Sequence, residues 1–262
     1  MKRRTGELQF QLPNVPEIPA WVLRSIERRI KKGNLTIVSA VCPDYERING
    51  RFTYKSVGCG VPYVAGQHLQ VVKSLISQIP ESVQVTYSVT LADTEFDLPL
   101  VMDHLVGGDP CEFLRRCQAS CENIFRLAQA QGLPIKSSNR FTKIFPKWFE
   151  FYNLALQGFR FEAETNSSTS FDLAANANSR SSLYFAMTGG VNEGDPEYCR
   201  EMVLRQWAQY AAWGEAAREV FGQDLIMINH STPNLGRVND QLFRRDRERI
   251  PILQLSTTTT PG

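Results

Sequence analysis

The hydrophobic pattern along this chain alternates between a helical period and short strand-like runs. Residues 20–32 carry apolar side chains at helical spacing, and residues 35–41 form an apolar, β-branched run typical of a strand buried on both faces. Residues 67–79 return to the helical period, and residues 83–91 form a second strand of the same kind. A strand, a helix and a strand in this order predict a βαβ unit that crosses over right-handedly into a parallel sheet.

The second half of the chain predicts further elements of both kinds. Two long helices are expected at residues 112–131 and 198–221, and a late strand at residues 224–229. Two segments lack either period and are predicted to be loops. One is the Gly- and Pro-punctuated segment 45–65, and the other is the Asn- and Ser-rich segment 166–180, which we expect to be mobile.

The length and composition fit one α/β domain. The chain has 262 residues, of which 42% are hydrophobic and 21% charged, values ordinary for a globular protein with a sizeable core. We therefore predict a three-layer, Rossmann-like parallel sheet with helices on both faces. This catalytic domain should span residues 20–255, between an extended lead-in at residues 1–19 and a disordered tail at residues 256–262.

Composition also limits the environment and the partners. The formal net charge is only +2, so attraction to nucleic acid must come from local clusters of basic residues. No apolar run approaches the about 18 residues that cross a membrane, and the basic N-terminus lacks the apolar core of a signal peptide. The six cysteines include no CxxC pair and the three histidines lie far apart. We expect reduced thiols in a cytoplasmic protein, with no metal and no cofactor.

Candidate chemistry lies at the predicted strand ends, because parallel sheets bind ligands beyond the carboxyl ends of their strands. The first strand ends near Ser39 and Cys42, which offer a hydroxyl or a thiol nucleophile if a base approaches. The alternative, which fits equally well, is that Ser39 is only a small strand residue and that Pro43 and Asp44 form a turn. The second strand ends near Asp93 and Glu95. Their carboxylates suit a substrate ammonium group or Mg²⁺, and the alternative is helix capping with solvated charge.

The late strand and a glycine-rich segment supply the other candidates. Asn229, His230 and Asn234 belong to the densest polar cluster of the chain, and function is favoured there over a simple turn. Residues 58–68 lead to His68 at the expected start of a helix, where backbone amides favour an anion. That segment lacks the spacing of phosphate-binding loops, and His68 also fits a packed residue.

Two basic clusters complete the set of candidates. One lies in the first predicted helix and the other lies within residues 244–249. Either cluster fits a solvated face or a surface that grips a phosphate backbone. The first cluster occupies the first predicted helix: Arg24, Arg28, Arg29, Lys31 and Lys32.

The order of these parts resembles the catalytic domain of class I aminoacyl-tRNA synthetases of the tyrosine/tryptophan type, which has a Rossmann-like (HUP) fold. Residues 62–69, with His68, are similar to the histidine signature of that family, and Asp93 stands where its second strand ends in an acid. The second histidine of the signature and the lysine-rich loop are absent, and those elements stabilise the adenylate-forming transition state. A fold of this kind without ATP machinery is similar to the tRNA-dependent cyclodipeptide synthases.

This resemblance implies a secondary-metabolite enzyme that takes aminoacyl groups from aminoacyl-tRNA and makes a cyclic dipeptide or related peptide bond without ATP. Carried over by position, Ser39 would hold the first aminoacyl group, with Cys42 as the substitute. Tyr210 and Glu215 would lie near the substrate amine, and His230 near the leaving group. The substrate-binding residues would be Asp93, Glu95, His68, Asn229 and Asn234, and the tRNA-binding residues those of the first basic cluster.

Two other functions fit the same residues. The first is a nucleotide-dependent small-molecule ligase or transferase that uses residues 58–68 for phosphate. The second is a non-catalytic binding protein, in which alanine at Asp93, Glu95 and His230 would leave the cellular role intact.

Overall fold

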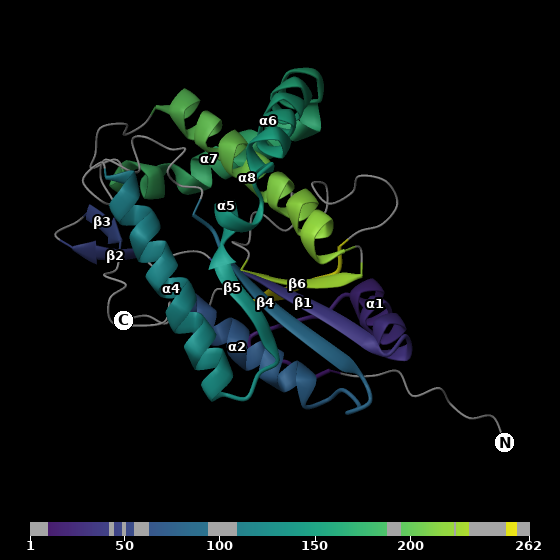
Figure 1. Ribbon diagram of the computed structural model, residues 1–262. Coiled ribbons are helices and arrows are strands. Elements are labelled where there is room, and N and C mark those ends of the chain that lie inside the picture. The colour runs from purple at the N-terminus through teal and green to yellow at the C-terminus, as the bar shows by residue number, and fades with distance from the viewer. Residues whose placement is uncertain are drawn as a thin grey trace.

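Five parallel strands form the centre of the molecule, in the order β5-β4-β1-β6-β7. The computed structural model describes residues 10–41, 45–48, 51–54, 63–93, 109–187, 195–222, 224–230 and 250–255. The strands of this sheet are β1 (Asn34–Val41), β4 (Gln84–Leu91), β5 (Ile135–Arg140), β6 (Leu225–His230) and β7 (Ile252–Leu255), of which the first four are labelled in Figure 1. This arrangement confirms the predicted three-layer α/β fold in a single domain.

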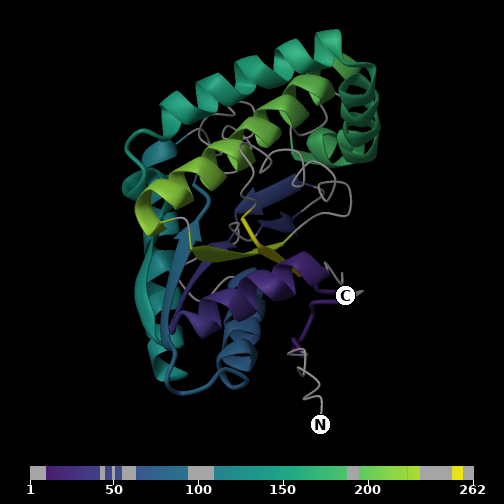
Figure 2. The ribbon, with the colours of Figure 1, turned by 90° about the vertical axis from the view of Figure 1, so that its right-hand side faces the viewer.

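Helices cover both faces of the sheet. One layer, called the α2 layer below, contains α1 (Ala20–Lys31), α2 (Tyr63–Ile76) and α4 (Pro110–Ala130). The opposite layer, called the α8 layer, contains α5 (Phe141–Ile144), α6 (Trp148–Thr165), α7 (Ser167–Met187) and α8 (Pro196–Phe221). In Figure 2, α6 and α8 lie above the sheet, and α1 and α2 lie below it.

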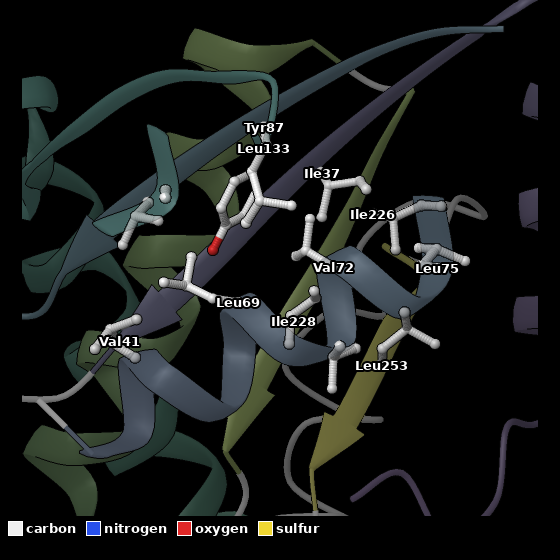
Figure 3. Close-up of a cluster of buried hydrophobic side chains, with 14 of the residues drawn as sticks. Ile37, Val41, Leu69, Val72, Leu75, Tyr87, Leu133, Ile226, Ile228 and Leu253 are labelled. Atoms are coloured by element: carbon white, nitrogen blue, oxygen red, sulfur yellow. The ribbon is translucent and has the colours of Figure 1, made fainter. Parts of the chain in front are cut away.

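The central strands are apolar because both of their faces are covered. Along β1, Ile37 and Val41 pack toward the α2 layer, whereas Val38 packs with α8. Figure 3 shows the first of these clusters, in which Leu69 and Val72 of α2 lie against side chains from the sheet. The near-continuous hydrophobic runs of these strands follow from this double burial.

The helix ends follow capping chemistry that is local in sequence. Asp109 and Asp195 each accept two backbone N–H groups at the starts of α4 and α8, and a proline occupies the first turn of both helices. Gly33, at φ 80°, lies between α1 and β1, as the sequence predicts. No helix among the described residues combines the length and apolarity that a membrane crossing requires.

The structure corrects both predicted loops. Within residues 45–65, Tyr45–Ile48 and Arg51–Tyr54 form the antiparallel strands β2 and β3, and α2 begins at Tyr63. In the segment 166–180, residues 167–180 are helical and belong to α7. Most residues of this segment are polar, but a narrow stripe along one side of the helix is buried, and this stripe includes Leu173 and Ala177. The predicted tail at residues 256–262 lies outside the described residues.

Candidate functional site

The carboxyl ends of β4, β1 and β6 lie side by side in the centre of the sheet. Val41, the last residue of β1, pairs with Leu91 at the end of β4, and Ala40 pairs with Asn229 of β6. The three strand ends that the sequence singled out therefore meet at one edge, where open parallel sheets bind ligands.

One row of side chains crosses all five strands at this edge. Register pairs join its members in turn, and we call it the carboxyl-edge row: Asn139, Thr90, Ala40, Asn229 and Gln254. Two positions earlier along their strands, three residues pack in the core of the α8 layer: Val38, Met227 and Ile252. Because strand side chains alternate between faces, the row also faces the α8 layer.

Solvent exposure alternates along the row. Thr90 and Asn229 are 1% and 2% exposed, whereas Ala40 between them is partly accessible to solvent, as are Asn139 and Gln254 on the outer strands. The partly buried Ala40 packs against the core of the α8 layer.

Thr90 ties the sheet to α8. Its hydroxyl donates to the backbone carbonyl of Ser39 at 3.1 Å and accepts from Trp213 Nε1 at 3.1 Å. Both bonds are buried, and together they use the donor and one acceptor position of the hydroxyl. Thr90 thus positions α8 over the row and has a structural role there.

Asn229 differs from Thr90 in its bonding. Its amide nitrogen is buried and finds no hydrogen-bond acceptor among the described residues. A buried amide without a partner costs free energy comparable to a lost hydrogen bond, so such groups are rare in folded proteins. Asn229 is thus a predicted substrate-binding residue whose described surroundings leave a donor unused.

Asp93 forms a second polar centre just beyond β4. It is fully buried, and its carboxylate accepts from Thr142 N at 2.9 Å, Thr142 Oγ1 at 2.6 Å and Arg140 Nη1 at 3.4 Å. Burial raises the pKa of Asp93 above its usual value, and the bonds from Thr142 and the charge of Arg140 oppose that rise. The carboxylate thereby joins the end of β4 to the start of α5.

Sequence reasoning missed the two partners of Asp93. Arg140 ends β5 and Thr142 belongs to α5, and neither element follows from the hydrophobic pattern. Cys121 of α4 lies in the same region, where burial and the charge of Asp93 raise the pKa of its thiol to about 12. Cys121 is therefore a protonated, unreactive thiol at neutral pH.

Ser39 faces the opposite side of the sheet from α8. Its side chain is fully buried, and its Oγ accepts a hydrogen bond from the Tyr87 hydroxyl at 3.0 Å. Tyr87 belongs to the core of the α2 layer and its hydroxyl points toward Leu69 in Figure 3, and burial raises its pKa above the usual value. The structure therefore does not bring the Ser39 hydroxyl together with Tyr210 and Glu215 of α8.

Tyr210 and Glu215 themselves lie on different sides of α8. Five positions along a helix correspond to a turn of about 140°. Tyr210 packs against the core of the α8 layer, whereas Glu215 is paired with Arg218 at 3.2 Å. Trp213 and Gly214, between them, are buried against the sheet side.

The remaining predicted residues fall into two groups. His68 is fully buried on α2, and because α2 begins at Tyr63, His68 lies in the second turn and not at the helix start. The predicted anion site at His68 is therefore displaced from the free backbone amides. Cys42, Glu95 and Asn234 lie outside the described residues. His230 is the last residue of β6.

The first basic cluster is mostly exposed, with one exception. Arg24, Arg28 and Lys31 are exposed on α1 and Lys32 is exposed just after it, but Arg29 is only 2% exposed. Arg29 donates to the Ser25 carbonyl at 3.0 Å and lies 3.8 Å from Asp224. Its assignment to a tRNA-binding surface is corrected on this ground: Arg29 secures α1 to the start of β6.

Comparison with known proteins gives structural likenesses only. No family model matches the chain, and no curated protein matches it. A CDPS from Staphylococcus haemolyticus is similar in structure at 13% identity and a TM-score of 0.46, over 95% of this chain and 97% of that chain. A cyclodipeptide synthase from Bacillus thermoamylovorans is similar at 12% identity and a TM-score of 0.43, over 90% and 92%. Neither likeness is close enough to transfer the role of any residue.

Proposed function

We propose that this protein is an aminoacyltransferase that takes aminoacyl groups from charged tRNA and joins them in a cyclic dipeptide or a related peptide bond without ATP. The observation that carries the proposal is the carboxyl edge of the sheet. There a partly accessible Ala40 lies between the buried polar side chains of Thr90 and Asn229, beneath α8. The sequence resemblance to tRNA-dependent cyclodipeptide synthases supplies the class of reaction.

The chemistry starts from an activated acyl group, because an aminoacyl ester on tRNA needs no ATP. The hydroxyl or thiol of the protein attacks the carbonyl carbon of the first ester, and the ribose oxygen of the first tRNA leaves with the proton. The neutral amine of a second aminoacyl-tRNA then attacks the enzyme-bound acyl carbon and releases the side chain with its proton. The remaining free amine attacks the second ester, which closes a six-membered ring and releases the second tRNA. Hydrogen-bond donors and a site shielded from water favour these steps.

The first aminoacyl group is proposed to rest on Ser39 or on Cys42; the buried Ser39 hydroxyl faces the α2 layer, so Ser39 would take the acyl group from that face and not from the side of α8. The bond from Tyr87 uses an acceptor position of Ser39 Oγ and leaves the proton of Ser39 available for donation. Cys42 follows directly after the last residue of β1 in sequence. An acyl group on Ser39 would be an ester and one on Cys42 a thioester, so neutral hydroxylamine distinguishes them by removing the thioester faster.

The other proposed contacts follow the sheet edge. His230 ends β6, and we propose that it donates the proton to the leaving ribose oxygen. Either Tyr210 or Glu215, which lie on different sides of α8, is proposed to orient the substrate amine together with Glu95 and Asn234. Asp93, whose buried carboxylate is bonded to Thr142 and Arg140, is proposed to support that site from the end of β4. His68 of α2 is proposed to contact the substrate from the α2 layer.

The test uses purified protein and charged tRNA in the absence of ATP. We expect mass spectrometry to find a diketopiperazine or linear dipeptide mass that Glu95→Gln and His230→Ala reduce at least tenfold. Uncharged tRNA with free amino acids and ATP is the control and should give no product.

Two results would overturn the proposal. If every charged tRNA leaves the product spectrum unchanged, no aminoacyl transfer occurs. Binding of ATP in a calorimeter, with product formed only when ATP is present, would identify a nucleotide-dependent ligase instead.

A further inference from the structure

The outer side of α6 carries acidic and large apolar side chains that face away from the core. Trp148, Tyr152 and Leu156 are buried on the inner side of this helix. Exposed residues follow one another at helical spacing on the opposite side, and we call them the α6 stripe: Glu150, Leu154, Gln157, Phe161 and Glu164. Leu154 is 61% exposed and Phe161 66%, so two large apolar side chains lie in water between two carboxylates.

The negative charge of the α6 stripe is not balanced on its own helix. Arg160 is the one basic residue in the sequence of α6, and its guanidinium is paired with Glu201 of α8 at 2.6 Å. Glu162 adds a further exposed carboxylate beside the stripe. A surface that is apolar in the middle and acidic at both ends fits a basic partner, because long basic side chains cover apolar area with their stems.

The complementary surface lies on α1 of the same chain. Arg24, Arg28 and Lys31 are exposed along one side of that helix. Helix α1 belongs to the α2 layer and α6 to the α8 layer, and Figure 2 shows the two helices on opposite faces of the sheet. Their charges therefore cannot meet within one molecule, but they can meet between two copies.

We propose that the α6 stripe docks onto the basic face of α1 in a second copy of this chain. Basic side chains of α1 reach the carboxylates of Glu150 and Glu164, and an arginine covers the ring of Phe161. The two surfaces differ, so the contact is heterologous and repeats from copy to copy into a ring or an open chain. A contact of one helix with another buries less than the about 800 Å² per partner of a standard interface, so the association is weak and falls with salt.

This inference goes beyond the proposed function and does not depend on the reaction. Assembly would cover the basic cluster that the sequence predicts to bind tRNA. A second copy and a tRNA would therefore exclude each other on α1. Self-association of this kind would limit access of tRNA when the protein is concentrated.

Sedimentation velocity of the full chain over a concentration series, at low and at high salt, tests the contact. The acidic-face variant combines Glu150→Gln, Phe161→Ser and Glu164→Gln, and the basic-face variant combines Arg24→Gln and Arg28→Gln. At low salt the wild type should form species larger than a dimer, and each variant alone should associate at least tenfold more weakly. An equimolar mixture of the two variants should form a one-to-one dimer and nothing larger, because the mixture retains one intact contact per pair.

The matched control makes the same chemical changes at exposed residues elsewhere: Glu122→Gln, Phe171→Ser and Glu219→Gln. Phe171 is 73% exposed on α7, which is more than Phe161. The control variant should associate like the wild type. All of the changed side chains are exposed, so circular dichroism should show wild-type helix content in every variant.

Several results would overturn the contact. The wild type could stay monomeric at low salt at every concentration, or stop at a closed dimer, which one partner on one face of the sheet cannot explain by this contact. Equal weakening in the acidic-face variant and the control would also contradict it. Association that ribonuclease abolishes would identify RNA, and not a second copy, as the occupant of α1. If the acidic-face variant does not fold, Leu154→Ser alone takes its place, and wild-type association of Leu154→Ser refutes the contact.

Discussion

The buried Asp93 carboxyl makes stability depend on pH in a direction opposite to that of most surface carboxylates. Burial raises its pKa in the folded chain, and a group of this kind stabilises the fold fully below its unfolded pKa and loses that contribution as pH rises through its folded pKa. Asp93→Asn stays neutral and can still accept from Thr142 N. We therefore expect the free energy of unfolding of the wild type to fall relative to Asp93→Asn as pH rises from about 3 to 7.

Urea unfolding at a series of pH values measures this difference. Asp109→Asn is the control, because it replaces an exposed helix-capping carboxylate by another good cap. A wild-type curve that runs parallel to that of Asp93→Asn across the range would contradict the prediction.

The hydroxyl of Thr90 gives a second test with single residues. Thr90→Val preserves the shape of the side chain but leaves Trp213 Nε1 buried without its acceptor, so we expect a loss of about 2 kcal/mol of unfolding free energy. Thr90→Ser keeps the hydroxyl and should lose less. Adding Trp213→Phe to Thr90→Val removes the orphaned donor, and a double-mutant cycle by urea unfolding should show coupling. Equal losses in Thr90→Val and Thr90→Ser would refute the assigned bond.

At the scale of elements, α7 shows how a polar sequence forms a helix. The Asn166 side chain accepts from the backbone N–H of Ser168 at 3.0 Å and of Thr169 at 3.4 Å, which caps the start of α7. We expect Asn166→Ala to lower the unfolding free energy by about 1 kcal/mol. Asn178 is exposed within the same helix, so Asn178→Ala should instead raise it slightly, by about 0.5 kcal/mol. Thermal unfolding compares the two, and changes of the same sign would contradict a cap at Asn166.

The contrast between α7 and the central strands explains what the sequence could predict. Strands β1, β4 and β6 are covered on both faces, so their apolar runs identify them without knowledge of the fold. The buried stripe of α7 is narrow, and α8 completes its cover, which a local pattern does not reveal. Strands β5 and β7 lie at the edges of the sheet and are short, and their pairing with β4 and β6 is decided by topology.

For the whole molecule, topology decides which predicted site residues meet. The strand order brings the ends of β4, β1 and β6 together, as the rule for open sheets predicts. The face on which each side chain lies depends on register, so the sequence could not separate Ser39 from α8 or join Asp93 to Arg140. The prediction that these three strand ends meet at one edge is confirmed, whereas the partners of the side chains along that edge did not follow from the sequence.

The exposed basic face of α1 gives the prediction at the largest scale, because a tRNA bound there, as proposed, would have to reach from α1 to the carboxyl edge of the sheet. α1 is followed by β1, whose eight residues cover about 26 Å to the carboxyl edge, a distance that a tRNA acceptor end can bridge. Arg24, Arg28 and Lys31 are exposed there, whereas Arg29 is buried. Each phosphate contact adds about 0.9 to the slope of log affinity against log salt concentration.

We therefore expect the triple change of Arg24, Arg28 and Lys31 to glutamine to reduce that slope by up to about 3 and to weaken tRNA binding at low salt. A triple change to glutamine at three exposed lysines elsewhere, Lys73, Lys136 and Lys147, removes the same charge and should change the slope by less than about 1. Fluorescence anisotropy of labelled tRNA over a salt series gives both slopes. Equal slopes in the two triple variants would show that general charge, and not the face of α1, attracts the nucleic acid.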